Sequence, residues 1–170
     1  MNPAKALGPA ILTFIAYIVF SGSVSGYDLI TGAAIAAVTG VLVSDFLVTD
    51  TRKSLDIRRL GWLIAYAFYY LTVAELKSHL SFAPKVLSGR IRPGVVAVRT
   101  PLKTEYGMVT LANSITNTPG TATVDIDPEK QVLYVHWLWV GAEDEEEIRE
   151  KIAKPFERFI KHIFEGGEQA

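Results

Sequence analysis

The chain has 170 residues, a formal net charge of −1 and no cysteine, which excludes disulfides, thiolate chemistry, iron–sulfur clusters and cysteine-bound zinc within it. Hydrophobic residues make up 49% of the sequence but are unevenly spread: the N-terminal half is typical of a membrane protein, the C-terminal half of a globular domain. The Lys and Arg residues flank the apolar segments instead of forming a basic face, so the charge pattern gives no indication of nucleic-acid binding.

The first apolar stretch, residues 6–48, carries formal charge only at Asp28 and Asp45. A bilayer core needs about 20 mostly apolar helical residues for each crossing. The stretch therefore predicts two transmembrane helices, at about 6–24 and 29–48, and the turn formers between them favour a tight hairpin. A single soluble core helix of this length would be unusual.

The second of these helices carries a stripe of small side chains on one face. Its members recur every four residues: Gly32, Ala36, Gly40 and Ser44. Such stripes let helix backbones approach closely in lipid, where apolar side chains gain nothing by leaving the acyl chains. Two interpretations stand: the stripe packs on the first helix of the same chain, or on a neighbouring protein of an assembly.

A third apolar stretch, residues 60–80, is long enough to cross a membrane, but it is amphipathic. Four aromatic residues cluster on one face at helical spacing: Trp62, Tyr66, Tyr69 and Tyr70. Such a face suits the headgroup region, where aromatic rings keep an apolar body in lipid and a polar edge in water. The sequence thus predicts a third membrane-embedded or interfacial helix. Because a crossing would place one set of flanking cations outside, charge counting favours an interfacial or re-entrant third helix.

The same rule places the N-terminus, the loop 52–59 and the C-terminal domain in the cytoplasm. Near the end of the third helix lie three ionisable residues, Glu75, Lys77 and His79. They are either part of an ion path, as intramembrane ionisable groups often are, or groups solvated at headgroup level, which is the more common case.

The sequence predicts two domains: a membrane domain over residues 1–88 and a small soluble α+β domain over residues 94–165. Alternating and β-branched runs predict three strands, and apolar residues at helical spacing predict one helix after Thr104 and a last helix that Pro155 bends or splits. The order is βαββα, a three-stranded sheet with helices over one face. The predicted strand 132–140 is apolar on both faces, so its second face needs a cover from the helices or from a partner.

No catalytic constellation is present in the sequence. The three histidines, His79, His136 and His162, lack ligand spacing, and neither a phosphate-binding glycine loop nor a nucleophile elbow occurs. The acidic run 143–147 is typical of the first turn of a helix, where the positive end of the helix dipole favours negative charge. The alternative interpretation of this run is a cation-binding site. We therefore expect no enzymatic activity, no catalytic or metal-binding residues and no cofactor.

Three segments carry a resemblance to a known family: Leu111–Thr121 (LANSITNTPGT), the strand Val124–Asp127 (VDID) and Val135–Leu138 (VHWL). They resemble the soluble half of the E subunit of the Mrp (Mnh) multisubunit sodium/proton antiporter. The preceding apolar segments resemble that family too, so the likeness covers nearly the whole chain.

The resemblance implies a non-catalytic accessory subunit of a multisubunit Na+/H+ antiporter in the plasma membrane, with other Mrp-type subunits and the bilayer as partners. Homologous modules are built into archaeal membrane-bound hydrogenases and sulfur-reducing complexes, and the chain alone does not distinguish these settings. Few Asn and Gln residues lean toward a thermophile. The alternative is a membrane-tethered sensor or protein-binding module with a small βαββα domain. A self-contained transporter would need more spans and an internal repeat.

Overall fold

The computed structural model describes residues 3–48, 51–54, 56–89 and 91–166. The chain divides into two compact units, Met1–Ile57 and Arg58–Ala170. The sequence predicts a boundary between the membrane and soluble domains at residues 88–94, which differs from this division. The third apolar segment belongs to the C-terminal unit because its aromatic face packs on the core of that unit. The side chain of Arg52, in the loop predicted to be cytoplasmic, lies outside the described part of the chain, as does Arg90.

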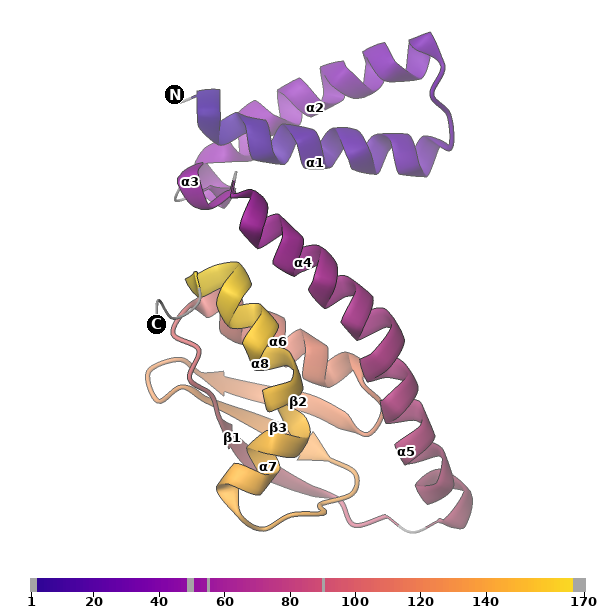
Figure 1. Cartoon of the computed structure of the whole chain (residues 1–170), viewed down its shortest axis with the longest axis vertical. Helices are drawn as coiled ribbons and strands as arrows, with labels where there is room; N and C mark the ends of the chain where they lie inside the picture. Colours follow the sequence, from indigo (N-terminus) through magenta and orange to yellow (C-terminus); the bar gives the residue numbers. More distant parts are fainter. Residues whose placement is uncertain (1–2, 49–50, 55, 90, 167–170) are drawn as a thin grey trace. The chain divides into compact units, whose positions relative to one another are not determined.

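The first unit is a helical hairpin of α1 (Pro3–Ser21) and α2 (Gly26–Leu47), followed by the short α3 (Thr51–Ser54) (Figure 1). Both long helices are apolar and long enough to cross a membrane, over Ala4–Ser21 and Gly26–Phe46. Each begins about three residues before its predicted start. The connection is short because Gly22 adopts a left-handed conformation (φ +64°) and Ser25 already caps α2.

The second unit begins with one continuous helical rod made of α4 (Ile57–Tyr69), the π-helical turn η1 (Tyr70–Ala74) and α5 (Glu75–Ser88). It is longer than the predicted helix 60–80. Gly89, in the left-handed conformation (φ +63°), ends it, and its N–H bonds the carbonyl of Val86.

The sheet consists of β1 (Gly94–Arg99), β2 (Thr121–Asp127) and β3 (Val132–Trp137). Its strand order is β1-β3-β2 and both pairings are antiparallel. The turn from β2 to β3 is closed by the carboxylate of Asp127, which accepts a hydrogen bond from the N–H of Lys130 at 3.0 Å. A bulge between Thr123 and Asp125 shifts the register of β2.

Helix α6 (Glu105–Asn117) lies between β1 and β2 in the chain, and Thr104 caps it as predicted, accepting a hydrogen bond from the N–H of Gly107 at 3.2 Å. The predicted last helix is split, as Pro155 indicated, into α7 (Glu145–Ile152) and α8 (Lys154–Ile160), with the π-turn η2 (Lys161–Glu165) after them. The acidic run meets the N-terminus of α7, where Asp144 caps the N–H groups of Glu146 and Glu147.

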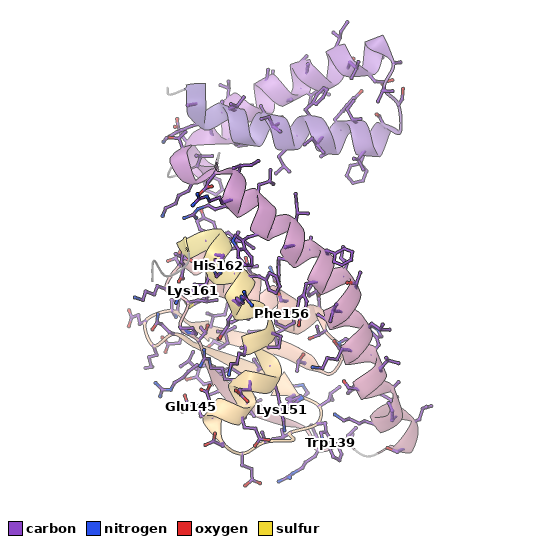
Figure 2. All side chains as sticks on the ribbon, viewed as in Figure 1. Trp139, Glu145, Lys151, Phe156, Lys161 and His162 are labelled. Atoms are coloured by element: carbon purple, nitrogen blue, oxygen red, sulfur yellow. The ribbon has the colours of Figure 1, made fainter. Side chains whose placement is uncertain are left out.

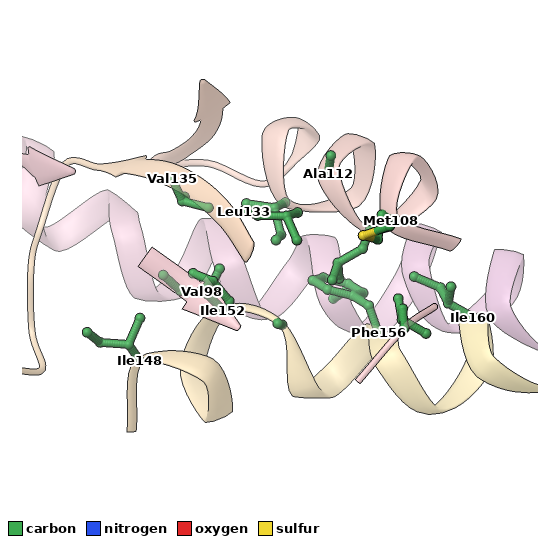
Figure 3. Packing of buried hydrophobic residues seen from close by; sticks show 14 of the residues in the cluster. Val98, Met108, Ala112, Leu133, Val135, Ile148, Ile152, Phe156 and Ile160 are labelled. Carbon is green, nitrogen blue, oxygen red and sulfur yellow. The ribbon is translucent and has the colours of Figure 1, made fainter. Parts of the chain in front are cut away.

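The core of the second unit lies between the sheet and its helices (Figure 3). Val98, Leu133 and Val135 project from the sheet and are fully buried against apolar side chains of α6, α7 and α8. The α4–η1–α5 rod forms a further layer, because Tyr66 contacts both α6 and α8 through Ser114 and Phe159. The rod is therefore an integral part of this unit.

A partly buried ion pair holds the two halves of the split last helix together. The guanidinium of Arg149 donates to the carboxylate of Glu157 at 2.8 Å, and it also pairs with Glu146 at 3.2 Å. The hydrogen bond from Arg149 to Glu157 is the main cause that raises the pKa of Arg149. This pair compensates the carboxylate that α8 places in an otherwise apolar region.

Candidate functional site: membrane and interaction surfaces

The small-residue stripe of α2 faces α1 of the same chain. Ala36 is only 4% exposed and Ser44 1%. A Cβ added to Gly40 would lie 2.8 Å from the Cβ of Ala10, and one added to Gly32 would lie 2.7 Å from the ring of Tyr17. Of the two interpretations of this stripe, packing within the hairpin is the arrangement found.

The hairpin turn contains a polar cluster centred on Asp28. Its carboxylate accepts hydrogen bonds from the hydroxyls of Ser23 and Ser25, both at 2.6 Å, while Ser25 in turn accepts from the N–H of Asp28 at 3.2 Å. This is a capping arrangement at the start of α2. The Ser25-Gly26-Tyr27-Asp28 spacing in the sequence is the signal for it, whereas the turn residues alone predicted only a loop.

The three ionisable residues at the end of the third apolar segment differ in exposure. Glu75 is three-quarters buried and pairs with His79 at 3.5 Å, whereas Lys77 and His79 are exposed. The carboxylate of Glu75 lies near the half-buried Tyr70. Burial first, and then Glu75, raise the pKa of Tyr70 to about 12. Glu75 thus interacts with two residues of its own rod, His79 and Tyr70.

The aromatic face of the rod contacts protein throughout its length. Trp62 stacks on His162 at 4.1 Å between ring centroids, Tyr69 stacks on Phe159 at 5.0 Å, and Tyr70 approaches Phe156 at 6.1 Å. The interpretation that these rings face lipid headgroups is therefore wrong. The same helical spacing serves domain packing instead (Figure 2, where His162 and Phe156 are labelled on the facing helix).

Arg59, which sequence reasoning treated only as a topology signal, caps the end of the last helix. Its guanidinium donates to the carbonyls of Ile163 at 2.8 Å and Phe164 at 3.2 Å. These carbonyl groups lie at the negative end of a helix dipole, where a cation is favourable.

We expect Arg59→Gln to lower the stability of the C-terminal unit by about 1 kcal/mol, because the charge and the paired donors at the helix end are lost. The measurement is chemical unfolding of the full chain in detergent. Arg99→Gln is the matched control, since Arg99 pairs with Glu145 on an exposed surface and surface pairs contribute about 0.5 kcal/mol. Equal losses in the two variants would contradict the capping role.

The outer face of the sheet is left open by the helices. His136 lies there on β3, paired with Val95 of β1 and Ala122 of β2, while Val95 and Val124 are well exposed. A shallow hollow of about 890 Å³ on this face is lined by apolar and acidic side chains, among them Val95, Val124, Tyr134, Asp125 and Glu129. The predicted need for a cover over the second face of β3 is thus not met by the helices.

Among the described residues, no group of three or more His, Asp or Glu side chains is placed to hold a metal ion. The three histidines lie on different elements: His79 on α5, His136 on β3 and His162 on η2. What the described chain offers is an apolar hairpin and exposed apolar faces.

The sequence pattern of the family described as "Na+/H+ ion antiporter subunit" (MNHE) matches residues 10–163, nearly the whole chain. This chain belongs to the MNHE family of Na+/H+ antiporter subunits. The family resemblance indicated by the sequence is thereby confirmed.

Two bacterial relatives bear the name of the E subunit of an Na(+)/H(+) antiporter. The protein of Bacillus subtilis (strain 168) is 33% identical over 111 residues, 65% of this chain and just under two thirds (66%) of that protein. The protein of Alkalihalophilus pseudofirmus is 29% identical over 154 residues, 88% of this chain and 91% of that protein.

A solved structure matches over nearly the full length. It is a chain in the structure of the membrane-bound sulfane sulfur reductase, described as an archaeal respiratory membrane complex. The identity is 34%, the TM-score 0.81, and the match covers 95% of this chain and 99% of that one. The likeness therefore extends over both the hairpin and the C-terminal unit.

In this MNHE chain, the segment that carries the family resemblance builds the corner between α6 and β2. Thr118 and Thr121 donate their hydroxyl groups to the carbonyl of Ile115 at 2.8 and 2.7 Å, which satisfies the end of α6. Gly120 has φ +94°, and a Cβ there would lie 2.7 Å from the ring of Phe82 on α5. The segment is thus structural: it turns the chain and seats the distal part of the rod.

Proposed function

We propose that this chain is a non-catalytic accessory subunit of a multisubunit Mrp-type membrane assembly that exchanges Na+ for H+, or of a respiratory complex that contains such a module. The observation that carries the proposal is the match over nearly the whole of both chains, at 34% identity, to a chain of an archaeal respiratory membrane complex. The names of the bacterial relatives add the antiporter setting. The chain contributes apolar surface to the assembly, and ion chemistry belongs to other subunits.

The proposed topology has α1 and α2 crossing the membrane and the C-terminal unit in the cytoplasm. The support is the positive-inside rule, since Lys5, Lys53, Arg58 and Arg59 all flank the hairpin on its open side. The chain has no cysteine, so single cysteines can be introduced and labelled from either side of sealed vesicles. Labelling of Lys53→Cys and Val124→Cys from opposite sides would overturn this topology.

The third helix, in this proposal, lies along the cytoplasmic surface and does not cross. Its inner face contacts the domain from Arg59, at one end, to Phe82 and Lys85, which meet Gly120 and Trp139 at the other. A crossing would carry the charged surface of α7 and α8 into the hydrocarbon, and a charge at the bilayer centre is costly.

The test of function is purification in mild detergent from cells that express the chain with its native membrane partners. We expect it to co-purify with several hydrophobic subunits, and we expect its removal to lower the yield of the intact complex and Na+/H+ exchange in vesicles. Recovery alone, or only as a homodimer, would favour the alternative, a membrane-tethered sensor or protein-binding module. The open sheet face is the observation that keeps this alternative in view.

A role of Glu75, Lys77 and His79 in the ion path is the remaining question about the site. We expect Glu75→Gln and His79→Gln to leave assembly intact and to change exchange little, since Glu75 lies beside the half-buried Tyr70 and His79 is exposed. Exchange in vesicles and complex yield on a native gel are the two measurements. Normal assembly with abolished exchange in Glu75→Gln would assign an ion-path role to the third helix.

A further inference from the structure

The side of the α4–η1–α5 rod opposite its aromatic face is a long aliphatic stripe. Its members are large apolar side chains that are between 49% and 89% exposed: Leu60, Ile64, Phe68, Leu71, Leu76, Leu80 and Leu87. They carry no formal charge, and the rod that presents them extends from Ile57 to Ser88. Soluble proteins rarely expose a contiguous apolar surface of this extent, so the stripe indicates a surface that contacts lipid or another protein. Figure 2 shows side chains projecting from the side of the rod that faces away from α6 and α8.

The π-turn keeps the stripe continuous. In an uninterrupted α-helix each residue advances by about 100°, so a stripe with one extra residue would rotate away from its face. The wider turn of η1, Tyr70–Ala74, absorbs one residue between Leu71 and Leu76. As a result both faces stay in phase: Tyr66, Ala74 and Phe82 remain toward the domain, while the aliphatic side chains remain on the outside.

The composition of the stripe fits lipid acyl chains better than another membrane helix. Helices that associate in lipid use small residues that allow close backbone approach, as α2 does with Ala36 and Gly40 against α1. The outer stripe consists of bulky Leu, Ile and Phe side chains, which fill the space between acyl chains and keep a neighbouring backbone at a distance.

Chain connectivity keeps the stripe at the membrane. Nine residues separate the end of α2 at Leu47 from the start of α4 at Ile57, which is a reach of at most about 32 Å. The rod of 32 residues is about 48 Å long, more than the hydrocarbon thickness of about 30 Å. A helix that is held close to the bilayer, is charged or protein-covered on one side and is aliphatic on the other is typical of an interfacial helix.

We propose that this aliphatic stripe is a lipid-binding surface: the rod lies parallel to the membrane with these side chains among the acyl chains of the cytoplasmic leaflet, and its aromatic face holds the domain on the water side. This inference rests on the topology proposed above. It assigns the membrane contact to the face opposite the one that the aromatic pattern suggested, and it makes the rod a platform that fixes the height and orientation of the domain.

The test uses the full chain in vesicles of phosphatidylcholine and phosphatidylglycerol, with nitroxide labels on single cysteines. Labels at Ile64→Cys, Phe68→Cys, Leu76→Cys and Leu80→Cys report on the stripe, and Val124→Cys on the open sheet face is the control. All five native side chains are well exposed, so labelling leaves the core intact. The readout is the collision rate of each label with apolar oxygen and with a water-soluble nickel chelate.

We expect the four stripe labels to collide several-fold more with oxygen, relative to the chelate, than the Val124 label does, and to lie at similar depths. Depths that change steadily from position 64 to position 80 would show a crossing helix and overturn the proposal. Chelate access at all four positions would also overturn it, and protection that arises only within the assembled complex would assign the stripe to a protein partner. The vesicles contain no other protein, so this result does not depend on the co-purification experiment. The lipid contact and the proposed place in an assembly can therefore fail independently of each other.

Discussion

Ala36→Leu is expected to destabilise the membrane hairpin by about 2 kcal/mol and to lower the yield of the assembled complex sharply. Ala36 is 4% exposed at the contact of α2 with α1, and the neighbouring Gly32 and Gly40 leave no room for a Cβ. A leucine there forces the two backbones apart, and overpacking of a well-packed contact costs about 1–3 kcal/mol. The measurements are unfolding of the full chain in detergent and complex yield on a native gel.

Ala37→Leu is the matched control, because it makes the same chemical change at the adjacent residue, which faces outward. We expect the hairpin of this variant to be as stable as the unchanged one. Equal destabilisation by both substitutions would contradict the role assigned to the stripe. A stable Ala37→Leu hairpin that no longer assembles would place a neighbouring protein on the outward face of α2.

Tyr66→Ala is expected to lower the stability of the C-terminal unit by about 3 kcal/mol and to release the rod from the domain. Tyr66 is 8% exposed, hydrogen-bonds Ser114 of α6 and packs on Phe159 of α8. Truncation of a buried aromatic side chain to alanine costs about 3–5 kcal/mol, as apolar contact is lost and a cavity remains. One measurement is chemical unfolding of the full chain. The other is the rate of protease cleavage after residue 89, between the rod and β1, which we expect to rise when the rod is released.

Phe68→Ala removes a ring of similar size from the opposite side of the same helix. Phe68 is 70% exposed, so we expect domain stability to change by less than about 0.5 kcal/mol. Tyr66→Phe separates packing from hydrogen bonding, and its expected cost of about 1 kcal/mol reflects the lost partner of Ser114. If Phe68→Ala destabilised the domain as much as Tyr66→Ala, the assignment of inner and outer faces would be wrong.

Much of the secondary structure followed from local sequence signals. The cap at Thr104 and the split at Pro155 were predicted and are confirmed, because each depends on the backbone within a few residues. The apolar hairpin was equally readable, since its composition alone satisfies the length and hydropathy of two crossings.

The partners of each face were not readable in the same way. Helical spacing shows that Trp62 and Tyr66 share a face, but aromatic rings suit a headgroup region and a protein core equally well. The π-turn at Tyr70–Ala74 leaves no clear local signal, and Arg59 has the same appearance in the sequence whether it is a topology signal or a helix cap.

The sequence by itself determined that this chain has an apolar N-terminal hairpin, a small sheet-and-helix domain and a resemblance to the E subunit of the Mrp antiporter. These properties depend on composition and on short periodic patterns. Only the tertiary structure decided that the α2 stripe meets α1, that the aromatic face of the rod meets α6 and α8, and that the aliphatic face stays open. The physical reason is that a periodic pattern specifies which side chains share a face, whereas the occupant of that face is chosen by residues far away in the chain, such as Ser114, Phe159 and Gly120.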